Sequence, residues 1–178
     1  KAGGSRAERI VTETSLLLNS PDFPIGKEAD LVRVFLEAVD CGFADEELGL
    51  TPCDTTVTEL SFRYGRADVV IFHVDGSATV IEAKDGSNGY NHVVAGIGQV
   101  SLYAAQLAMN KSALKRVKKA LLWSSTGSNE LDALIWITCD RAGVIALPWP
   151  ATKMLLACRA ATRKVILEDM EHGCAQEG

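Results

Sequence analysis

Residues 67–84 hold the feature that most constrains the fold, two strand-like runs joined by a short turn. The runs, 67–74 and 77–84, are dominated by apolar and β-branched residues, which favour strands over helices. Between them stands Asp75-Gly76, a dipeptide typical of hairpin turns. We therefore predict that the two runs are adjacent antiparallel strands.

Three charged residues interrupt this apolar hairpin. Asp68 opens the first run, and Glu82 and Lys84 close the second. Residues i and i+2 on a strand share a face, so Glu82 and Lys84 point the same way. Charges in a core hairpin are costly to desolvate unless they are paired or bind a metal. An exposed edge with a Lys–Glu pair is the alternative explanation, and the hairpin alone does not choose between the two.

The length of the turn decides whether Asp68 and Glu82 meet. A two-residue loop would place Asp68 opposite Ala83, on the other face from Glu82. A three-residue loop, with Gly76 as a left-handed bulge residue, would place Asp68 directly opposite Glu82, with Cβ atoms ~4.5–5.5 Å apart. Two carboxylates this close repel each other, and a hard cation such as Mg²⁺ or Mn²⁺ would resolve the repulsion. We predict the three-residue loop, with Lys84 able to hold an attacking water near the metal.

The rest of the chain reads as alternating helices and strands in the order α-α-β-β-β-α-β-α-β-α. The expected helices are 6–18, 26–40, 92–109, 128–140 and 151–171, the expected strands are 56–63, 67–74, 77–84, 117–124 and 143–147, and 41–55 is expected to be a loop. Hairpins give antiparallel pairs and a helical crossover gives a parallel one. The order therefore predicts an α/β fold with a mixed sheet flanked by helices.

Composition narrows the class of protein. The 178 residues, 47% hydrophobic, favour a single globular domain over 1–178. The net charge of −5 is mild evidence against a protein that coats nucleic acid. Five cysteines without a CxxC pair argue against a disulfide framework and a zinc ribbon, and favour a reducing, cytoplasmic setting. No apolar run approaches the roughly 18–20 residues that span a bilayer.

Several common catalytic patterns are missing. The sequence has no GxxxxGK[ST], no GxSxG, and no HExxH or HxH spacing, so a Walker-type phosphate cradle, a serine-hydrolase elbow and a histidine-built zinc site are not expected. A basic run at 111–119 contains no acid. It is either a solvated surface or an edge that contacts phosphate, with Lys111 and Lys115 as the candidate substrate-binding residues.

Taken together, Asp68, a 13-residue gap and Glu82-Ala83-Lys84 resemble the D…(D/E)xK signature of the PD-(D/E)XK nuclease superfamily. The α-β-β-β-α-β order over 26–124 is similar to that family's core. Glu28, in phase with the apolar face of the helix at 26–40, matches an acid common in the family. The residue before Asp68 is Ala67 rather than Pro, and the cysteines do not match those of the family's iron–sulfur members.

The segment Gln99-Val-Ser-Leu-Tyr103 resembles the QxxxY motif of the RecB-like exonuclease branch. Gln99, Tyr103 and Gln106 fall at i, i+4 and i+7, on one helical stripe. We expect this stripe to point toward Lys84, opposite an apolar side formed by Val93, Ile97, Val100 and Ala104. Alternatively, Tyr103 is an edge residue of the core and Gln99 is solvated.

The resemblance implies a restriction-endonuclease-like αβββαβ core over about 26–124, with a C-terminal α-β-α extension over about 125–178. It implies hydrolysis of DNA phosphodiester bonds with Mg²⁺ or Mn²⁺ as cofactor. The implied metal ligands are Asp68, Glu82 and the backbone carbonyl of Ala83, with Glu28 completing a second site or acting through water.

The same resemblance implies roles around the metal. Lys84 would orient the water and stabilise charge that develops on the phosphate. Gln99 and Tyr103 would position Lys84 or a substrate phosphate. Arg63 and Arg66 flank the site and either hold the DNA backbone or are ordinary surface charges.

Two other classes of function stay open. A catalytically silent protein of the same fold would bind nucleic acid or a protein partner. An unrelated α/β interaction protein would use the Asp, Glu and Lys cluster as a structural ion network. The sequence leaves open whether a nuclease would be an exonuclease or an endonuclease, and whether the chain forms a homo-oligomer.

Overall fold

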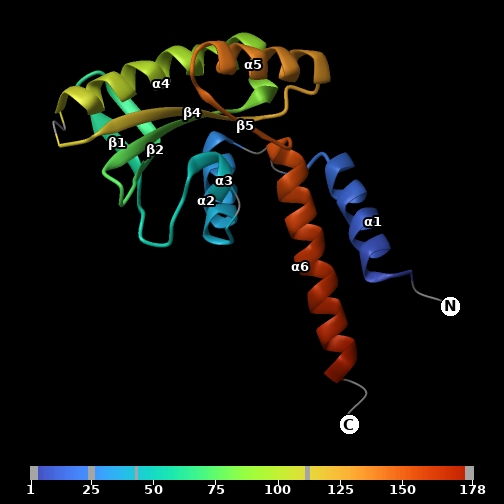
Figure 1. The fold of residues 1–178 in the computed structure, drawn as a ribbon. Coiled ribbons are helices and arrows are strands. Elements are labelled where there is room, and N and C mark those ends of the chain that lie inside the picture. The colour runs from blue at the N-terminus through green and yellow to red at the C-terminus, as the bar shows by residue number, and fades with distance from the viewer. Residues whose placement is uncertain (1–3, 24–26, 43, 111–112, 175–178) are drawn as a thin grey trace. The chain divides into compact units, whose positions relative to one another are not determined.

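The computed structural model describes residues 4–23, 27–42, 44–110 and 113–174, with side chains up to residue 171 (Figure 1). The elements that it describes are α1 (Arg6–Asn19), α2 (Glu28–Asp40), α3 (Asp45–Leu48), β1 (Thr55–Phe62), β2 (Gly65–Phe72), β3 (Ser77–Lys84), η1 (Gly86–Asn88), α4 (Tyr90–Asn110), β4 (Arg116–Ser124), α5 (Asn129–Arg141), β5 (Ile145–Trp149) and α6 (Thr152–Cys174). Each predicted helix and strand is confirmed, with its ends shifted by at most three residues.

Two short elements were not predicted. The loop expected over 41–55 contains α3, whose four residues are too few to show helical periodicity, although Leu48 is fully buried. The 3₁₀ turn η1 follows β3 directly. Its second amide, at Ser87, donates to the side chain of Asp85 at 2.9 Å, a local contact of the kind that Asp makes at helix starts.

The chain divides into two compact units, residues 27–151 and residues 1–26 with 152–178. Unit 27–151 contains the whole sheet and the helices that cover it. It therefore also contains α5 and β5, which were expected in a C-terminal extension. The expectation of a single domain over 1–178 stays a prediction.

The sheet of unit 27–151 has the strand order β1-β2-β3-β4-β5. β1, β2 and β3 pair antiparallel, whereas β4 pairs parallel with both β3 and β5. Figure 1 shows α4 and α5 along one face of this sheet and α2 and α3 on the other. All eight residues of β3 are buried because the strand is central and covered on both faces. The α/β class, the mixed sheet and the αβββαβ order from α2 to β4 are confirmed.

Two apolar clusters hold these layers together. The cluster on the α4 side includes Val70, Val80, Val100 and Leu121. The cluster on the α2 side includes Leu31, Phe35, Val69, Ile81 and Leu122. Neighbouring residues of one strand thus face opposite layers, as the pleat requires.

The predicted three-residue turn between β2 and β3 is also confirmed. The amide of His73 donates to the carbonyl of Ser77 at 2.9 Å, and Gly76 has φ +83°. A residue with a side chain would be strained at that φ, so glycine fits this position. The pairing of Val69 with Ile81 and Val70 with Val80 follows from this turn.

Unit 1–26 with 152–178 consists of α1 and α6. Ser5 and Glu8 form a capping box at the start of α1, and α6 buries a stripe made of Ala157, Ala161 and Val165. Arg6 and Arg9 of α1 form ion pairs with Asp169 of α6. No helix within the described ranges is long and apolar enough to cross a membrane.

Candidate active site

Glu82 and Lys84 lie at the C-terminal end of β3, on one face, as predicted. The Nζ atom of Lys84 donates to Oε1 of Glu82 at 2.8 Å, and only 9% and 5% of the two side chains are exposed. The stem of Lys84 runs beneath Gly96 of α4, where an added Cβ would lie 3.0 Å from Lys84 Cγ and 2.6 Å from Leu121 Cδ1. Helix α4 therefore covers the lysine closely, and only glycine leaves room for it.

The second oxygen of Glu82 is not satisfied. Oε2 is buried and has no hydrogen-bond partner among the described residues. Burial raises the pKa of Glu82 to about 7, with the charges of Asp68 and Glu28 adding to the rise and the hydrogen bond from Lys84 opposing it. A buried carboxylate oxygen without a donor is costly, so this atom is where a cation or a water would be most favourable.

Asp68 leaves the regular ladder beside this pair. By the confirmed register it stands opposite Glu82, but the regular pairing ends at Val69 and Ile81. Oδ2 of Asp68 instead accepts the backbone N–H of Ala83 at 2.7 Å. Burial raises the pKa of Asp68, as does the charge of Glu28, against the lowering by the Ala83 amide and Lys84.

The strict alternation of faces breaks at this point of β2. Ala67 and Val70 both pack in the cluster on the α4 side, although residues three apart on a regular strand face opposite ways. That Asp68 and Glu82 share one face stays a prediction. What the structure does give is an Asp68 carboxylate that accepts the backbone N–H of Ala83, the residue between Glu82 and Lys84 in the chain.

Glu28, the first residue of α2, joins the site through one oxygen. Its Oε1 lies 2.6 Å from Nε2 of His92 and accepts the backbone N–H of Asp85 at 3.2 Å. The side chains of Glu28 and His92 are 38% and 37% exposed. These contacts join the starts of α2 and α4 to the end of β3.

Sequence reasoning missed His92 and Asp85. A search for paired histidine ligands passes over a single histidine whose partner is 64 residues away. The signal that could have identified His92 is its position in the first turn of the helix that follows Glu82-Ala83-Lys84. Asp85 is buried; it holds η1 and accepts the hydroxyl of Ser124 at 3.1 Å.

The cluster brings three carboxylates to one lysine. Burial alone would lower the pKa of Lys84, but the hydrogen bond and charge of Glu82, with the charges of Glu28 and Asp68, raise it, so Lys84 remains an ammonium at neutral pH. Among the residues that the structure describes, no group of three or more His, Cys, Asp or Glu side chains is placed to hold a metal ion. An ion here would thus draw on two carboxylates, with backbone carbonyl and water oxygens completing its shell.

The predicted QxxxY stripe is placed differently from our expectation. Tyr103 is buried on the same face of α4 as Val100 and Ala104, not opposite them. Its ring stacks on Phe62, with centroids 5.9 Å apart, and fills the space above Gly65, where an added Cβ would lie 2.6 Å from Cε1. The space left by Gly65 lets the large ring of Tyr103 enter the core. The packing of Tyr103 therefore agrees with the alternative interpretation, in which it is an edge residue of the core.

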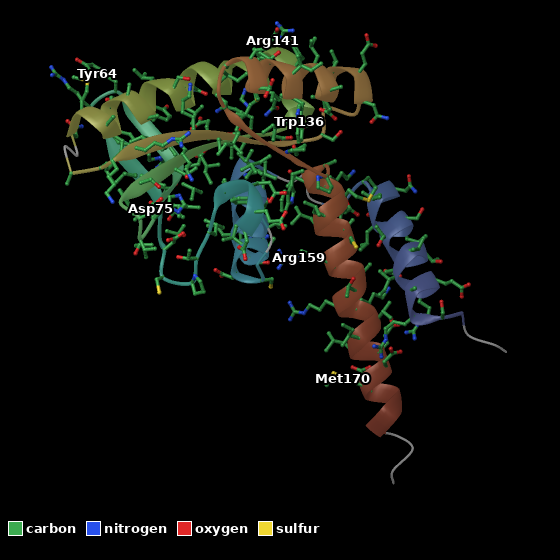
Figure 2. The ribbon with its side chains drawn as sticks, viewed as in Figure 1. Tyr64, Asp75, Trp136, Arg141, Arg159 and Met170 are labelled. Atoms are coloured by element: carbon green, nitrogen blue, oxygen red, sulfur yellow. The ribbon has the colours of Figure 1, made fainter. Side chains whose placement is uncertain are left out.

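The other stripe residues have separate surroundings. Gln106 holds the β1–β2 turn, because its amide group bonds both the N–H and the carbonyl of Tyr64, at 2.9 and 3.2 Å (Tyr64 is labelled in Figure 2). Gln99 is half-buried, and its buried Oε1 has no hydrogen-bond partner among the residues that the structure describes. An approach of Gln99 to Lys84 stays a prediction.

The predicted basic residues fall at two ends of the sheet. Arg66 is exposed and pairs with Glu59 at 3.2 Å, and Arg63 lies over the ring of Tyr64, both near the start of β2. Lys115 lies at the other end, where its amide bonds the carbonyl of Gly76 in the β2–β3 turn. The structure therefore does not group Lys115 with the carboxylates, since β3 and β4 run parallel away from that end. Lys111 lies outside the described residues.

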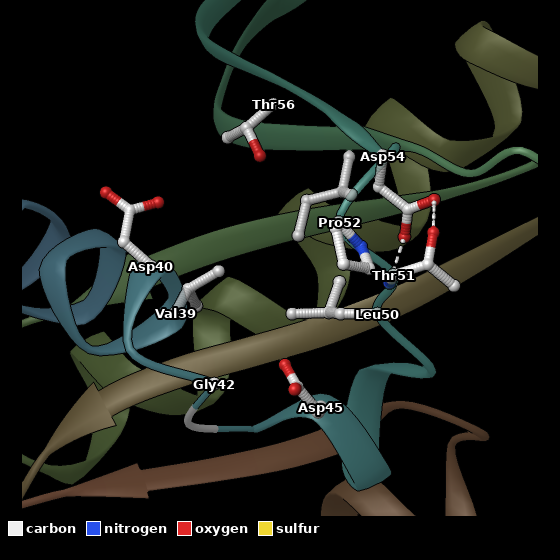
Figure 3. Close-up of a pocket in the computed structure, with 10 residues that line it drawn as sticks. Val39, Asp40, Gly42, Asp45, Leu50, Thr51, Pro52, Asp54 and Thr56 are labelled. Atoms are coloured by element: carbon white, nitrogen blue, oxygen red, sulfur yellow. Dashed lines mark hydrogen bonds between the residues drawn. The ribbon is translucent and has the colours of Figure 1, made fainter.

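One cavity of this unit, of about 520 Å³, is lined by Glu28, Asp68 and Arg66 together with both apolar and charged residues of α2. Another, of about 370 Å³, is lined by Asp40, Asp45 and Asp54 among others (Figure 3). Figure 3 shows that Asp54 is bonded to Thr51, so this acid already serves the fold.

Comparisons with known proteins give a fold-level likeness only. No protein-family model and no curated protein matches the chain. A solved repair endonuclease from Pyrococcus abyssi is similar over 74% of this chain and 50% of its own, at 17% identity and a TM-score of 0.47. The EndoMS–dsDNA2 complex is similar over 75% of this chain and 48% of its own, at 15% identity and 0.46. The chain spans about half the length of these structures, and a likeness this small assigns neither a family nor an activity.

Proposed function

We propose that this protein is a metal-dependent nuclease that hydrolyses DNA phosphodiester bonds. The observation that carries the proposal is the buried, unpartnered Oε2 of Glu82, which lies in one cluster with Asp68 and Lys84. A purely structural ion pair would gain nothing from leaving that oxygen without a donor.

The proposed cofactor is Mg²⁺ or Mn²⁺. Glu82 and Asp68 supply the carboxylate oxygens that these cations prefer, and the carbonyl of Ala83 would supply a third donor. Glu28, tied through Oε1, would act through water. When bound there, the ion would activate a water and polarise the phosphate.

Lys84 is the proposed group that holds the attacking water and stabilises charge on the phosphate. Its ammonium is kept charged by the surrounding carboxylates. Gln99, with its unpartnered oxygen, is proposed to orient that ammonium. Tyr103 would act at a distance, because it packs on Gly65, three residues before Asp68.

DNA is the proposed partner. Arg66 and Arg63 are proposed to contact its backbone beside the carboxylates, and Lys115 could reach only a longer duplex, at the other end of β3. We keep the cytoplasm as the proposed compartment; the described cysteines are free thiols.

A catalytically silent protein of the same fold is the second candidate. Lys84 is bound to Glu82 and Arg66 to Glu59, so the cluster could persist as an ion network that binds DNA or a protein without cleaving it.

The deciding experiment is DNA degradation by the purified protein with Mg²⁺, Mn²⁺ or EDTA. We expect cleavage with either metal and none with EDTA. Lys84→Ala should lower the rate by about 10²–10³-fold, the usual loss when one group that stabilises the transition state is removed. Arg163→Ala, an exposed change in unit 1–26 with 152–178, is the matched control and should retain activity. DNA binding without cleavage would favour the silent candidate, and neither would favour the interaction protein.

A further inference from the structure

The contact between His92 and Glu28 points to a role that the proposed mechanism does not use. Nε2 of His92 lies 2.6 Å from Oε1 of Glu28, and the amide of Asp85 donates to the same oxygen. Resting on the proposed function, we propose that His92 is a positioning residue that fixes the Glu28 carboxylate so that its Oε2 faces the metal-binding pair Asp68 and Glu82.

Glu28 needs such a hold because of where it stands. It is the first residue of α2, and its side chain is more than one-third exposed. A glutamate in such a place has many rotamers, and it loses that freedom only when partners fix it. The amide of Asp85 supplies one contact, at 3.2 Å, and His92 supplies the shorter one.

His92 is well placed to transmit a fixed geometry. It stands in the first turn of α4, next to the buried Val93 and one turn before Gly96, which rests directly on the stem of Lys84. The helix that covers Lys84 therefore also carries the donor for Glu28. Sites built on rigid elements hold their groups more precisely than sites on loops.

The position of Glu28 matters to the whole cluster. Its charge acts on Asp68, Glu82 and Lys84 alike. A rotation of Glu28 toward solvent would weaken this influence and would remove an oxygen that orders water around the ion. Removal of outer hydrogen-bond partners of a metal site typically costs 10–100-fold in metal affinity or activity.

A titration with Mn²⁺, followed by the unfolding temperature of the full chain, tests the proposal. His92→Ala should raise the Mn²⁺ concentration for half-maximal stabilisation about tenfold. His92→Gln keeps an N–H that can reach Oε1 and should restore most of the affinity. Asn91→Ala, at the exposed neighbouring position, should titrate like the wild type. Without metal, the three variants should unfold close to the wild type, since none removes a buried side chain.

A second arm asks whether His92 acts through Glu28. Added to Glu28→Ala, the change His92→Ala should shift the titration no further, because the partner is already gone. An equal shift in both backgrounds would overturn the proposal. If the wild type is stabilised by Mn²⁺ and His92→Ala titrates identically, this inference fails alone. If Mn²⁺ does not stabilise the wild type, the metal part of the proposed function fails, and this inference with it.

Discussion

Buried carboxylates at the two ends of the β2–β3 hairpin differ in how fully they are hydrogen-bonded. At the turn end, where Asp75 is labelled in Figure 2, Asp54 has donors on both oxygens: His73 Nδ1 lies 2.8 Å from Oδ2, and the amide of Val74 donates to Oδ1. His73 in turn bonds the fully buried Thr79. At the open end, Oε1 of Glu82 accepts a hydrogen bond from Lys84, whereas Oε2 has no hydrogen-bond partner among the described residues.

The pKa values follow the same contrast. Burial pushes the pKa of Asp54 up, but hydrogen bonds from His73, Thr51 and Val74 outweigh it and hold the value at about 2. At Glu82, the effect of burial outweighs the hydrogen bond from Lys84, and the pKa is about 7. A satisfied buried acid stabilises a fold, whereas an unsatisfied one costs stability. The difference supports the proposal that the open end binds a cation, whereas the acid at the turn end stabilises the fold.

Removing the acid at the turn end should have the largest effect on stability. Asp54→Ala leaves several donors, among them His73 and Val74, without their acceptor. We expect a loss of about 3–5 kcal/mol in the free energy of unfolding, measured in urea, as is usual when one partner of a buried pair is removed. Asp45→Ala, at the exposed acid of the same cavity, should stay within about 0.5 kcal/mol. Equal effects of the two changes would erase the contrast.

Removing the charge of Glu82 at the open end should instead increase the free energy of unfolding. The pKa of Glu82 is about 7 in the folded chain against an ordinary 4.5. The folded state therefore holds a proton that the unfolded state has lost, and this group makes stability fall as pH rises from 4.5 to 7. Glu82→Gln should stabilise the metal-free protein by on the order of 1–3 kcal/mol at pH 8 and leave it unchanged at pH 4. Glu59→Gln, at an exposed position, is the control. A destabilised Glu82→Gln at pH 8 would show that the pair with Lys84 is structural.

The hairpin and its register could be predicted from the sequence because their causes are local. Gly76 permits the left-handed turn, and the turn length sets which residues oppose each other. The break in alternation at Asp68 could not be predicted. There the side chain of Asp68, rather than a backbone carbonyl of β2, accepts the N–H of Ala83.

Parts of the site also depended on distant contacts. Tyr103 was assigned to the wrong face because the space that admits its ring belongs to Gly65, in another element. His92 was missed because its partner Glu28 lies far away in the chain. The place of Lys115 could not be predicted from its charge, because it follows from the parallel β3–β4 pair, which puts it at the other end of the sheet from the carboxylates; its contact with DNA stays a prediction.

The central claim is that the open end of the hairpin binds a divalent cation between Asp68 and Glu82. Thermal unfolding with and without saturating Mn²⁺ tests it most directly. We predict that Mn²⁺ raises the stability of the wild type by about 1–3 kcal/mol, as expected for a ligand well above its dissociation constant, and that Asp68→Asn abolishes the gain. Melting curves of the wild type that coincide with and without Mn²⁺, or an Asp68→Asn variant stabilised as much as the wild type, would contradict it.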